Sequence, residues 1–337
     1  MWAELGDDRG LVELRRVLDH RDADGFVPHV VYAPLADPHE AFWGRPGTSS
    51  ITQPPMVGHA LAELARRGVE VGEELLAGAT HALRFLLDVR ARHPSGLVAL
   101  CHPWESGADD SPRWDHWYGS PWDGPTAYRV KGELLAAVER SGGGAPVANP
   151  AFDVAPASFS ALVAFNAREL AGLTGDSRLA GDADELAGAL DRRWDPALAT
   201  WVDAGASAAG SGRVRTLDAL LGALVSPDPA KVGAALDQLV DPAALGGECG
   251  PAGVHRSEPV FEPRSYWRGS AWPQLAYLAW VAAVRAGRPE VAARLAATTL
   301  EGASRSGLAE HWDPDEGAPL GAVPQSWTGL VLVMTDP

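Results

Sequence analysis

Apolar positions recur along almost the whole chain at intervals of three and four residues, the spacing of one face of an α-helix. No segment shows a convincing alternation of apolar and polar residues, which would indicate a half-buried strand. The pattern therefore predicts an all-α fold. We expect helices over about residues 10–19, 55–68, 71–93, 128–140, 155–175, 178–193, 214–226, 229–241, 269–286, 288–304 and 326–334.

Several of these segments are joined by short turns whose residues end one helix and begin the next. The turns are Gly68-Val69-Glu70, Gly175-Asp176-Ser177, Ser226-Pro227-Asp228-Pro229 and Gly287-Arg288-Pro289. Glycine is favoured just after a helix, and proline or a capping side chain at the start of one. The paired segments are therefore predicted to form helical hairpins.

The two members of a late pair differ in character. Residues 269–286 are apolar on nearly all sides, whereas residues 288–304 carry charges on one face and should meet water. Long loops rich in glycine, proline and aromatic residues separate the hairpins. Repeated inner and outer helices predict a toroid of helical hairpins whose long loops form a pocket at one end. No hydrophilic linker divides the chain, so residues 1–337 are interpreted as one domain.

Charge and composition narrow the possible partners. The formal net charge of −16, from 28 basic and 44 acidic residues, argues against nucleic acid and anionic membranes as partners. No apolar run approaches the roughly 18–20 residues that a membrane span needs, and the acidic start does not resemble a signal peptide. Cys101 and Cys249 lack the spacing of a metal site, so we expect a cytoplasmic protein, although a disulfide between them stays open.

No metal or organic cofactor is expected, because no His, Cys or carboxylate cluster has ligand spacing and no glycine-rich phosphate loop occurs. The 13 Trp exceed the 7 Phe and 5 Tyr. Tryptophan combines a large apolar face with a polar edge, which suits a carbohydrate site.

Candidate chemistry is concentrated in the loop of residues 102–115, the sequence His-Pro-Trp-Glu-Ser-Gly-Ala-Asp-Asp-Ser-Pro-Arg-Trp-Asp. It holds two indoles, one guanidinium and four carboxylates, and its glycine and prolines exclude a long regular element. Indole faces can cover the C–H face of a sugar while carboxyls bind hydroxyls or transfer protons. The alternative is a solvated acidic surface loop with incidental tryptophans.

Three further loops carry candidate residues. Gln53 can bind hydroxyls as donor and acceptor, or it can equally cap the helix that follows. The aromatic stretch 261–273 contains Arg268 and Gly269, for which we favour ligand binding over a packed helix entry with Arg268 paired to a carboxylate. Glu310 precedes a turn beside Trp312 and is either a positioned base or a solvated acid.

Four ordered motifs together resemble glycoside hydrolase family 63, above all its bacterial mannosylglycerate and glucosylglycerate hydrolase-like branch, and more distantly trehalase-like enzymes. The motifs are residues 102–114, residues 50–55, Tyr266-Trp267-Arg268-Gly269-x-x-Trp272-Pro273, and Glu310 with Gly317 and Ser326-Trp327-Thr328. The resemblance covers most of the chain.

The resemblance implies an (α/α)6 barrel, which is a toroid of six helical hairpins. It also implies an inverting hydrolase of an α-linked small glycoside, a glucosylglycerate or mannosylglycerate or another α-glucoside. Asp109 would be the general acid and Glu310 the general base, about 6.5–9.5 Å apart across the pocket. The sugar would be bound by Gln53, Trp104, Glu105, Arg113, Tyr266, Trp267, Arg268, Gly269, Trp272 and Trp312.

The chain also departs from the family pattern. Position 110 is Asp where relatives usually have Asn, so Asp110 is the alternative general acid, and Lys131 replaces the Asp of an Arg-x-Asp pattern. Eleven predicted helices are one short of twelve, and we expect the missing one to be the first, as in an N-terminally truncated chain. The competing hypothesis is therefore an inactive sugar-binding toroid or a truncated fragment; the sequence does not determine the sugar, the aglycone or the oligomeric state.

Overall fold

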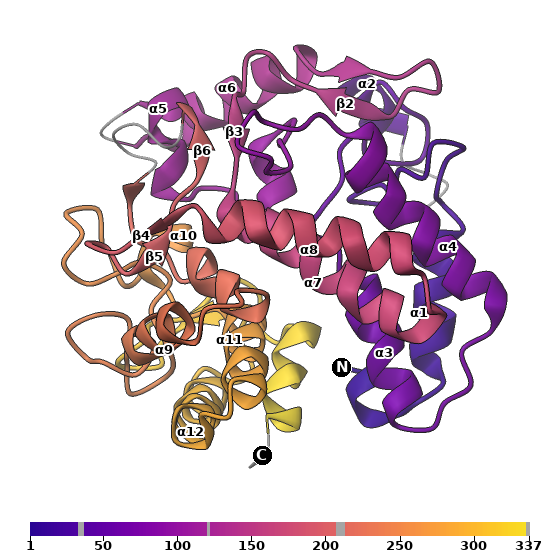
Figure 1. The fold of residues 1–337 in the computed structure, drawn as a ribbon. Coiled ribbons are helices and arrows are strands. Elements are labelled where there is room, and N and C mark those ends of the chain that lie inside the picture. Colours follow the sequence, from indigo (N-terminus) through magenta and orange to yellow (C-terminus); the bar gives the residue numbers. More distant parts are fainter. Residues whose placement is uncertain (33–36, 120–121, 207–212, 335–337) are drawn as a thin grey trace.

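The computed structural model describes residues 1–32, 37–119, 122–206 and 213–334, most of them helical (Figure 1). The α-helices are α1 (Arg9–Leu18), α2 (Asp37–Trp43), α3 (Val57–Arg66), α4 (Glu73–Arg84), α5 (Asp115–Tyr118), α6 (Gly124–Ala136), α7 (Ala157–Thr174), α8 (Ser177–Asp191), α9 (Pro229–Gln238), α10 (Tyr266–Gly269), α11 (Pro273–Arg285) and α12 (Pro289–Arg305).

Tighter and wider helical turns complete the helical part. The 3-10 segments are η1 (Ala3–Leu5), η3 (Pro103–Ser106), η4 (Pro112–Trp114), η7 (Asp218–Leu224) and η8 (Ser326–Val333), and η2 (Phe85–Val89) is a π-helix that continues α4. All eleven predicted helices have a helical counterpart. The short α2, α5 and α10 were not predicted, because one or two turns carry too few residues for a periodic pattern.

The strands of the described chain are short and pair in antiparallel twos. They are β1 (Glu139–Arg140) with β2 (Pro146–Ala148), β3 (Val154–Ala155) with β6 (Ala204–Gly205), β4 (Trp194–Asp195) with β5 (Thr200–Trp201), and β7 (His311–Trp312) with β8 (Pro319–Leu320). Strands of two or three residues show no alternating pattern, which is why the sequence did not predict them.

Two helices begin later than the sequence predicts because the preceding residues pair with other segments. Thr216 forms a bridge with Val254, so η7 starts only at Asp218. Ala271 pairs with Trp312, and α11 therefore starts only at Pro273, a proline at the first helical position.

The predicted contrast between a buried and an amphipathic partner is confirmed for the hairpin α11–α12, and α7–α8 shows the same contrast. Most of α7 and α11 is buried, whereas α8 and α12 keep one polar, exposed face. The turn between α7 and α8 has the predicted chemistry: Gly175 has a left-handed φ of 70°, and the Asp176 side chain accepts from the Leu179 backbone N–H at 2.9 Å.

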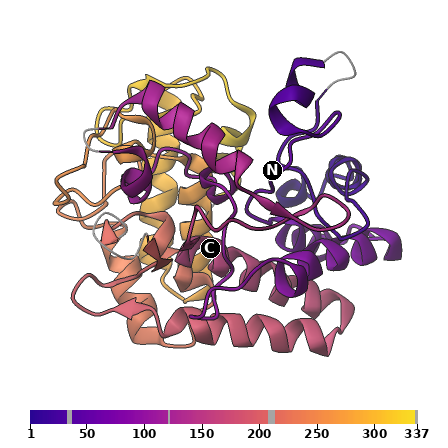
Figure 2. The ribbon, with the colours of Figure 1, turned by 90° about the horizontal axis from the view of Figure 1, so that it is seen from above.

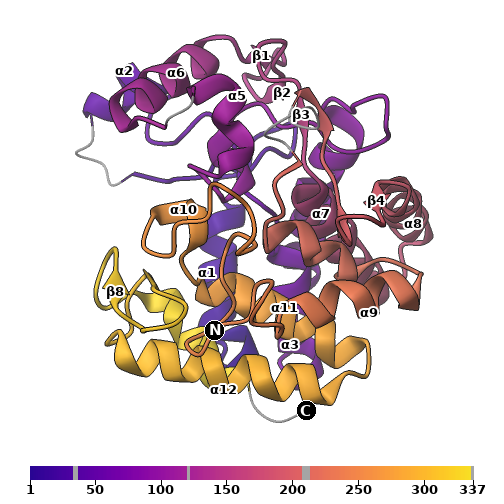
Figure 3. The same ribbon diagram turned by 90° about the vertical axis from the view of Figure 1, so that its left-hand side faces the viewer.

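The hairpin α7–α8 lies between the N-terminal helices α1, α3 and α4 and the C-terminal group α9, α11 and α12 (Figures 1 and 2). Helix α7 packs against both α3 and η7, and α11 packs against η7 and η8. One large apolar core extends through these elements. The loops between hairpins gather above α11, where α10 lies close to α5 (Figure 3).

Two further observations bear on the sequence analysis. Cys101 and Cys249 are both buried and free, so the disulfide left open by the sequence does not form. Among the described residues, no helix is both long and apolar enough to cross a bilayer.

Candidate active site

A cavity of about 410 Å³ lies where the loops meet the ends of α3, α7 and α11. Its helical wall is largely apolar and includes Met56, Leu162, Leu221, Leu278 and Leu330. Its loop wall contains polar and aromatic side chains that could bind or react with a ligand, namely His29, Gln53, Asp109, Tyr266, Trp267 and Trp327. Four of the residues predicted to form the site, Gln53, Asp109, Tyr266 and Trp267, therefore meet at one cavity.

The loop that carries Asp109 is largely buried and held by local hydrogen bonds. His102 caps η3 by accepting from the Trp104 backbone N–H at 3.2 Å, and Gly107 ends η3 with a left-handed φ of 71°. The Trp114 indole is fully buried and donates to the Ala108 carbonyl at 2.7 Å. The alternative of a solvated surface loop is therefore wrong.

The four carboxylates of this loop have different partners. Glu105 pairs with Arg90, Asp110 with Lys131 at 2.6 Å, and Asp115 with Arg268. Asp109 has no ion-pair partner in the described part of the chain. The acid that lines the cavity is thus the one whose carboxyl is left unpaired.

The surroundings of Asp109 favour its neutral form. Burial raises the pKa of Asp109 to about 7; the Lys131 ammonium opposes this rise, and the charges of Asp110 and Glu310 add to it. A carboxyl with a pKa near 7 is protonated in part at neutral pH, which is what a general acid needs.

Glu310 is held by the loop that follows β8. Its Oε2 accepts from the Ala322 backbone N–H at 3.0 Å, and its own N–H donates to the Ala322 carbonyl at 2.8 Å. Gly321 has a φ of 71°, and a Cβ added there would lie 2.3 Å from Glu310 Oε2. Glycine at this position therefore lets the loop close against the carboxylate.

Glu310 is half-buried and does not itself line the cavity, but its charge reaches residues that do. Burial and the charges of Asp109 and Glu310 raise the pKa of the Tyr266 phenol. The Trp327 indole lines the cavity and donates to the Glu310 carbonyl at 3.1 Å. Tyr266 is thus the cavity residue that lies within the electrostatic influence of both candidate catalytic carboxylates.

An aromatic stack supports the loop wall. Trp267 lies parallel to Trp272, with ring centroids 3.9 Å apart, and Trp272 stacks in turn on His311 at 4.4 Å. Trp272 is only 1% exposed and does not line the cavity. The predicted sugar contact of Trp272 is therefore wrong, and Trp272 instead supports Trp267 from behind. The buried indole N–H of Trp267 has no geometric hydrogen-bond partner in the described structure.

Gln53 is exposed at the cavity and does not cap α3, because Met56 occupies the N-cap position without a side-chain hydrogen bond. The neighbouring Thr52 N–H donates to Glu105 Oε1 at 3.0 Å, which fixes the backbone next to Gln53. The capping alternative is therefore wrong, and the side chain of Gln53 remains available to a ligand.

Glu105 is completely buried, and its carboxylate accepts four hydrogen bonds. Two come from Arg90, at 2.6 and 2.9 Å, and two from the backbone N–H groups of Cys101 and Thr52. Although burial alone would raise the pKa of Glu105, these donors hold it below its usual value. Glu105 joins the Gln53 loop to the Asp109 loop and has no surface left for a sugar.

Arg113 is likewise buried, at 1% exposure, and pairs with two acids, Asp203 at 3.2 Å and Asp218. Asp203 also accepts from the Ala157 N–H at the start of α7, at 2.9 Å. The guanidinium thereby anchors the Asp109 loop to α7 and η7. A direct sugar contact by Arg113 is not compatible with this burial.

Four other predicted contacts also have structural roles. Arg268 pairs with Asp115 at 3.0 Å, which ties α10 to α5 and confirms the paired alternative. A Cβ on Gly269 would meet the Glu262 carbonyl at 2.5 Å, so this glycine serves backbone packing. Trp312 is fully buried against Cys249. Trp104 packs on Trp43 and His102 outside the cavity. The predicted sugar contacts of these four residues are corrected accordingly.

Sequence reasoning missed several residues of the lining. The loop residue His29 lines the cavity, and its Nδ1 has no hydrogen-bond partner in the described chain. Burial lowers its pKa, so a neutral ring is favoured. Ser158 and Asp218 also line the cavity. No pattern marked Ser158 and Asp218, because their neighbours in the sequence belong to ordinary helical segments. Trp327 lay in a recognised motif but was not selected.

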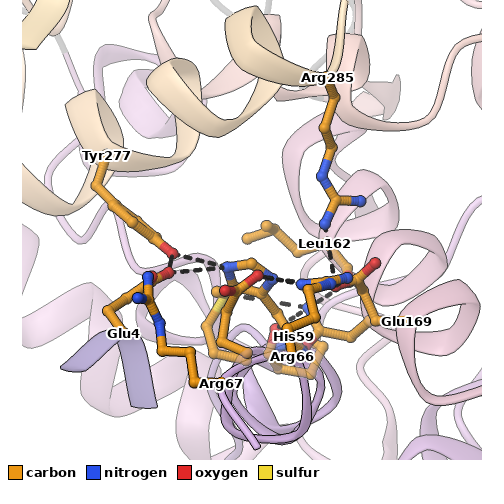
Figure 4. A network of polar contacts seen from close by, with 12 residues as sticks. Glu4, His59, Arg66, Arg67, Leu162, Glu169, Tyr277 and Arg285 are labelled. Carbon is orange, nitrogen blue, oxygen red and sulfur yellow. Dashed lines mark hydrogen bonds and ion pairs between the residues drawn. The ribbon is translucent and has the colours of Figure 1, made fainter. Parts of the chain in front are cut away.

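One cluster at the helical wall has ligand atoms close enough for a metal ion. Ligand atoms of Glu4, His59 and Glu63 lie within 4.8 Å of one another. Figure 4 shows that Glu4 and His59 belong to a larger network, in which Tyr277 donates to Glu4 and lies 2.7 Å from His59 Nε2. The cluster connects η1, α3 and α11.

The charges of that network are already balanced. Arg67 pairs with Glu4 at 2.9 Å, Arg66 pairs with Glu63 and Glu169, and Arg285 pairs with Glu169 at 3.0 Å. Although burial opposes it, hydrogen bonds from His59, Arg285 and Arg66 lower the pKa of Glu169 to about 2. Three guanidinium groups face three carboxylates, so a cation would have to displace them. We interpret the network as structural.

Known proteins match the chain over nearly its whole length. A family model described as the mannosylglycerate hydrolase MGH1-like glycoside hydrolase domain matches residues 1–328. A glucosylglycerate hydrolase of Mycolicibacterium hassiacum is 28% identical over 98% of this chain and 88% of its own length. A mannosylglycerate hydrolase of Thermus thermophilus is 27% identical over 98% of this chain and 90% of its own length.

Solved structures are similar in fold. The crystal structure of family 63 mannosylglycerate hydrolase from Thermus thermophilus in complex with Tris and D-glycerate has a TM-score of 0.80 at 22% identity, over 99% of this chain and 92% of that one. Neutral trehalase Nth1 from Saccharomyces cerevisiae has a TM-score of 0.55 at 12% identity, over 99% of this chain and 70% of that one. At these identities the similarity shows the fold.

Proposed function

The chain belongs to the mannosylglycerate hydrolase MGH1-like glycoside hydrolases of family 63, and from this premise we propose that it is an inverting hydrolase of a small α-linked glycerate glycoside. The relatives that match almost the whole chain are named glucosylglycerate and mannosylglycerate hydrolases. Both names describe a hexose joined to glycerate, so these two compounds are the proposed substrates.

The assignment of the general acid depends on one observation. Among the four carboxylates of the 102–115 loop, Asp109 is the one that lines the cavity and has no cationic partner in the described chain. Burial raises its pKa to about 7. Asp110, the alternative left open by the sequence, is ion-paired with Lys131 and does not line the cavity. Asp109 is therefore the proposed acid.

Glu310 is the proposed general base. As a carboxylate it would take a proton from water while the water attacks the anomeric carbon, and Asp109 would give its proton to the leaving glycerate oxygen. The C–O bond to the aglycone breaks as the C–O bond to water forms on the opposite face, which inverts the anomeric configuration. The hydrogen bond from Ala322 holds the Glu310 carboxylate in place.

The sugar itself would lie against Tyr266 and Trp267. The face of Trp267 is fixed from behind by Trp272, so the indole is held in place for stacking on a sugar ring. Gln53 offers a donor and an acceptor on the opposing loop.

We also propose that the paired helices form the six-hairpin toroid predicted from the sequence. The succession of packed inner elements α3, α7, η7, α11 and η8 supports it. So does the similarity in fold to the mannosylglycerate hydrolase and to the trehalase.

The test is hydrolysis of α-glucosylglycerate and α-mannosylglycerate, followed by proton NMR from the first seconds of reaction. Inversion predicts that the β-anomer of the free sugar appears first and then mutarotates. Asp109→Asn and Glu310→Gln should each lose activity by at least about 100-fold, the contribution typical of a general acid or base.

Glu316→Gln is the matched control, because Glu316 is an exposed acid six residues from Glu310. It should keep wild-type activity. An α-anomer as the first product would refute inversion, and full activity of Asp109→Asn would refute the acid assignment. Binding of either glycoside without turnover by the wild-type protein would support the competing hypothesis of a sugar-binding toroid.

A further inference from the structure

The chain has only two lysines, Lys131 and Lys231, among 28 basic residues. Lys131 lies in α6 and is buried, with 5% of its surface exposed. A buried lysine requires a partner, and here the partner is Asp110, whose Oδ1 lies 2.6 Å from the ammonium nitrogen. This pair lies directly next to the proposed acid along the chain.

The position of the ammonium is fixed from several sides. It lies 5.5 Å from the centre of the Trp104 ring and 5.4 Å from the centre of the Tyr118 ring, within cation–π distance of both. The backbone of Lys131 is held as well: its carbonyl lies 2.9 Å from His102 Nε2. Because His102 Nδ1 accepts from the Trp104 N–H, the ring proton is on Nε2 and is donated to Lys131.

The same loop is attached to α6 by a further contact. The Asn149 amide donates both to the Cys101 carbonyl at 2.6 Å and to the Leu134 carbonyl at 2.8 Å. Helix α6 and the segment before Asp109 are thus joined at two points before the ion pair is added. Lys131 is consequently a fixed charge and not a mobile one.

We propose that Lys131 is a positioning residue for the general acid: by binding Asp110 outside the cavity, it selects Asp109 as the single carboxyl of the pair that faces the substrate. This inference rests on the proposed function. Its geometric basis is that Asp109 lines the cavity and Asp110 does not. The Tyr118 hydroxyl contributes by donating to the Asp109 carbonyl at 3.1 Å.

Lys131 also acts on the charge balance around Asp109. The charged and titratable groups that face Asp109 come from its own loop, from α5, α6 and α10, and from the loop after α12. They are Asp110, Tyr118, Lys131, Tyr266 and Glu310, and behind Tyr118 lies the Asp115–Arg268 pair. Burial raises the pKa of Asp109, while Lys131 is the cation that limits this rise. Removing Lys131 or Asp110 should therefore move that pKa in opposite directions.

The experiment is the pH dependence of kcat/KM on the preferred glycoside for three variants. Lys131→Met should move the alkaline limb upward by about one unit, because Asp109 then keeps its proton to higher pH. Asp110→Asn should move the limb downward by about one unit, because it removes an anion and leaves Lys131 unpaired. The double variant should return close to the wild-type limb.

Conservative and matched substitutions complete the design. Lys131→Arg keeps the charge and should keep the wild-type alkaline limb, even where turnover falls. Lys231→Met removes the other lysine, which pairs with Asp191 at 2.5 Å, and should leave the pH profile unchanged. Limbs that stay in place, or that move in the same direction in both single variants, would overturn the proposal.

A second readout does not depend on activity. Protein grown with ¹⁵N-lysine should give two side-chain Nζ resonances, and Lys231→Met assigns them. Asp110→Asn should shift the Lys131 resonance, which reports the ion pair directly. If Asp109→Asn leaves turnover intact, the proposed function fails whatever this spectrum shows; if Asp109→Asn abolishes turnover and the limbs do not move, the role of Lys131 alone fails.

Discussion

Replacing Glu105 by Gln should destabilise the protein strongly even though no substrate contact is lost. The wild-type carboxylate is fully buried and accepts from both Arg90 amino groups and from the N–H groups of Cys101 and Thr52. Glutamine keeps one acceptor oxygen and places an NH₂ group against donors. The variant leaves the Arg90 guanidinium, which is 0% exposed, without its counter-charge.

The size of the effect follows from that burial. Breaking a buried ion pair by removing one partner costs about 3–5 kcal/mol, a large part of the roughly 5–15 kcal/mol that stabilises a folded protein. Because the pKa of Glu105 is held below its ordinary value of 4.5, its contribution is fully present above that pH and is lost as pH falls through the lowered pKa. The difference between wild type and variant should therefore shrink in acid.

Urea unfolding followed by tryptophan fluorescence, at pH 7 and in a series that extends well below pH 4.5, measures both effects. Glu70→Gln is the control, because Glu70 is exposed and outside every ion pair of the described residues; it should change the unfolding free energy by less than about 0.5 kcal/mol. A Glu105→Gln variant within about 1 kcal/mol of wild type at pH 7 would refute the structural role of Glu105.

Three other predictions follow from the site. Gly321→Ala should lower kcat by about 100-fold, because the added Cβ would lie 2.3 Å from Glu310 Oε2 and displace the carboxylate. Gly287→Ala is the control, because Gly287 has a similar φ but no atom near the position of an added Cβ. Equal losses of kcat in both variants would contradict this reason. The alkaline limb of kcat/KM should lie near pH 7, where Asp109 loses its proton, and disappear from the residual activity of Asp109→Asn. In a Cys249→Ser background, Cys101 should resist a thiol reagent at pH 8 until urea is added, because burial raises its pKa to about 12; rapid labelling of the folded protein would exclude this burial.

The fold was largely predictable because its signal is local. The apolar period located all eleven main helices, and glycine and proline marked the turn from α7 to α8 and the start of α12. The late starts of η7 and α11 have a common physical cause, which is pairing with distant residues. The Thr216 bridge to Val254 shortened η7, and the Ala271 bridge to Trp312 delayed α11. A single sequence does not show such pairing.

The site was predictable only in part, because residue type does not show burial. The sequence placed Gln53, Asp109, Tyr266 and Trp267 at a sugar site, and all four line the cavity. It placed Glu105, Arg113, Trp272 and Trp312 there as well, although each is at most 1% exposed. Charged and aromatic side chains suit a ligand and a packed polar core equally well, so a motif alone does not separate the two roles.

The four acids of the 102–115 loop show why the partner, and not the motif, decides the chemistry. Three are matched with cations that lie 15, 21 and 153 positions away in the chain. Each ion pair fixes the loop and also keeps its carboxylate ionised, so that this group does not serve as the proton donor. What remains is one carboxyl, on Asp109, in a buried site with a like charge nearby on Glu310. Burial raises the pKa of that acid, and the ammonium that binds its neighbour Asp110 limits the rise, which is why substitutions at Lys131 should alter catalysis without touching the substrate.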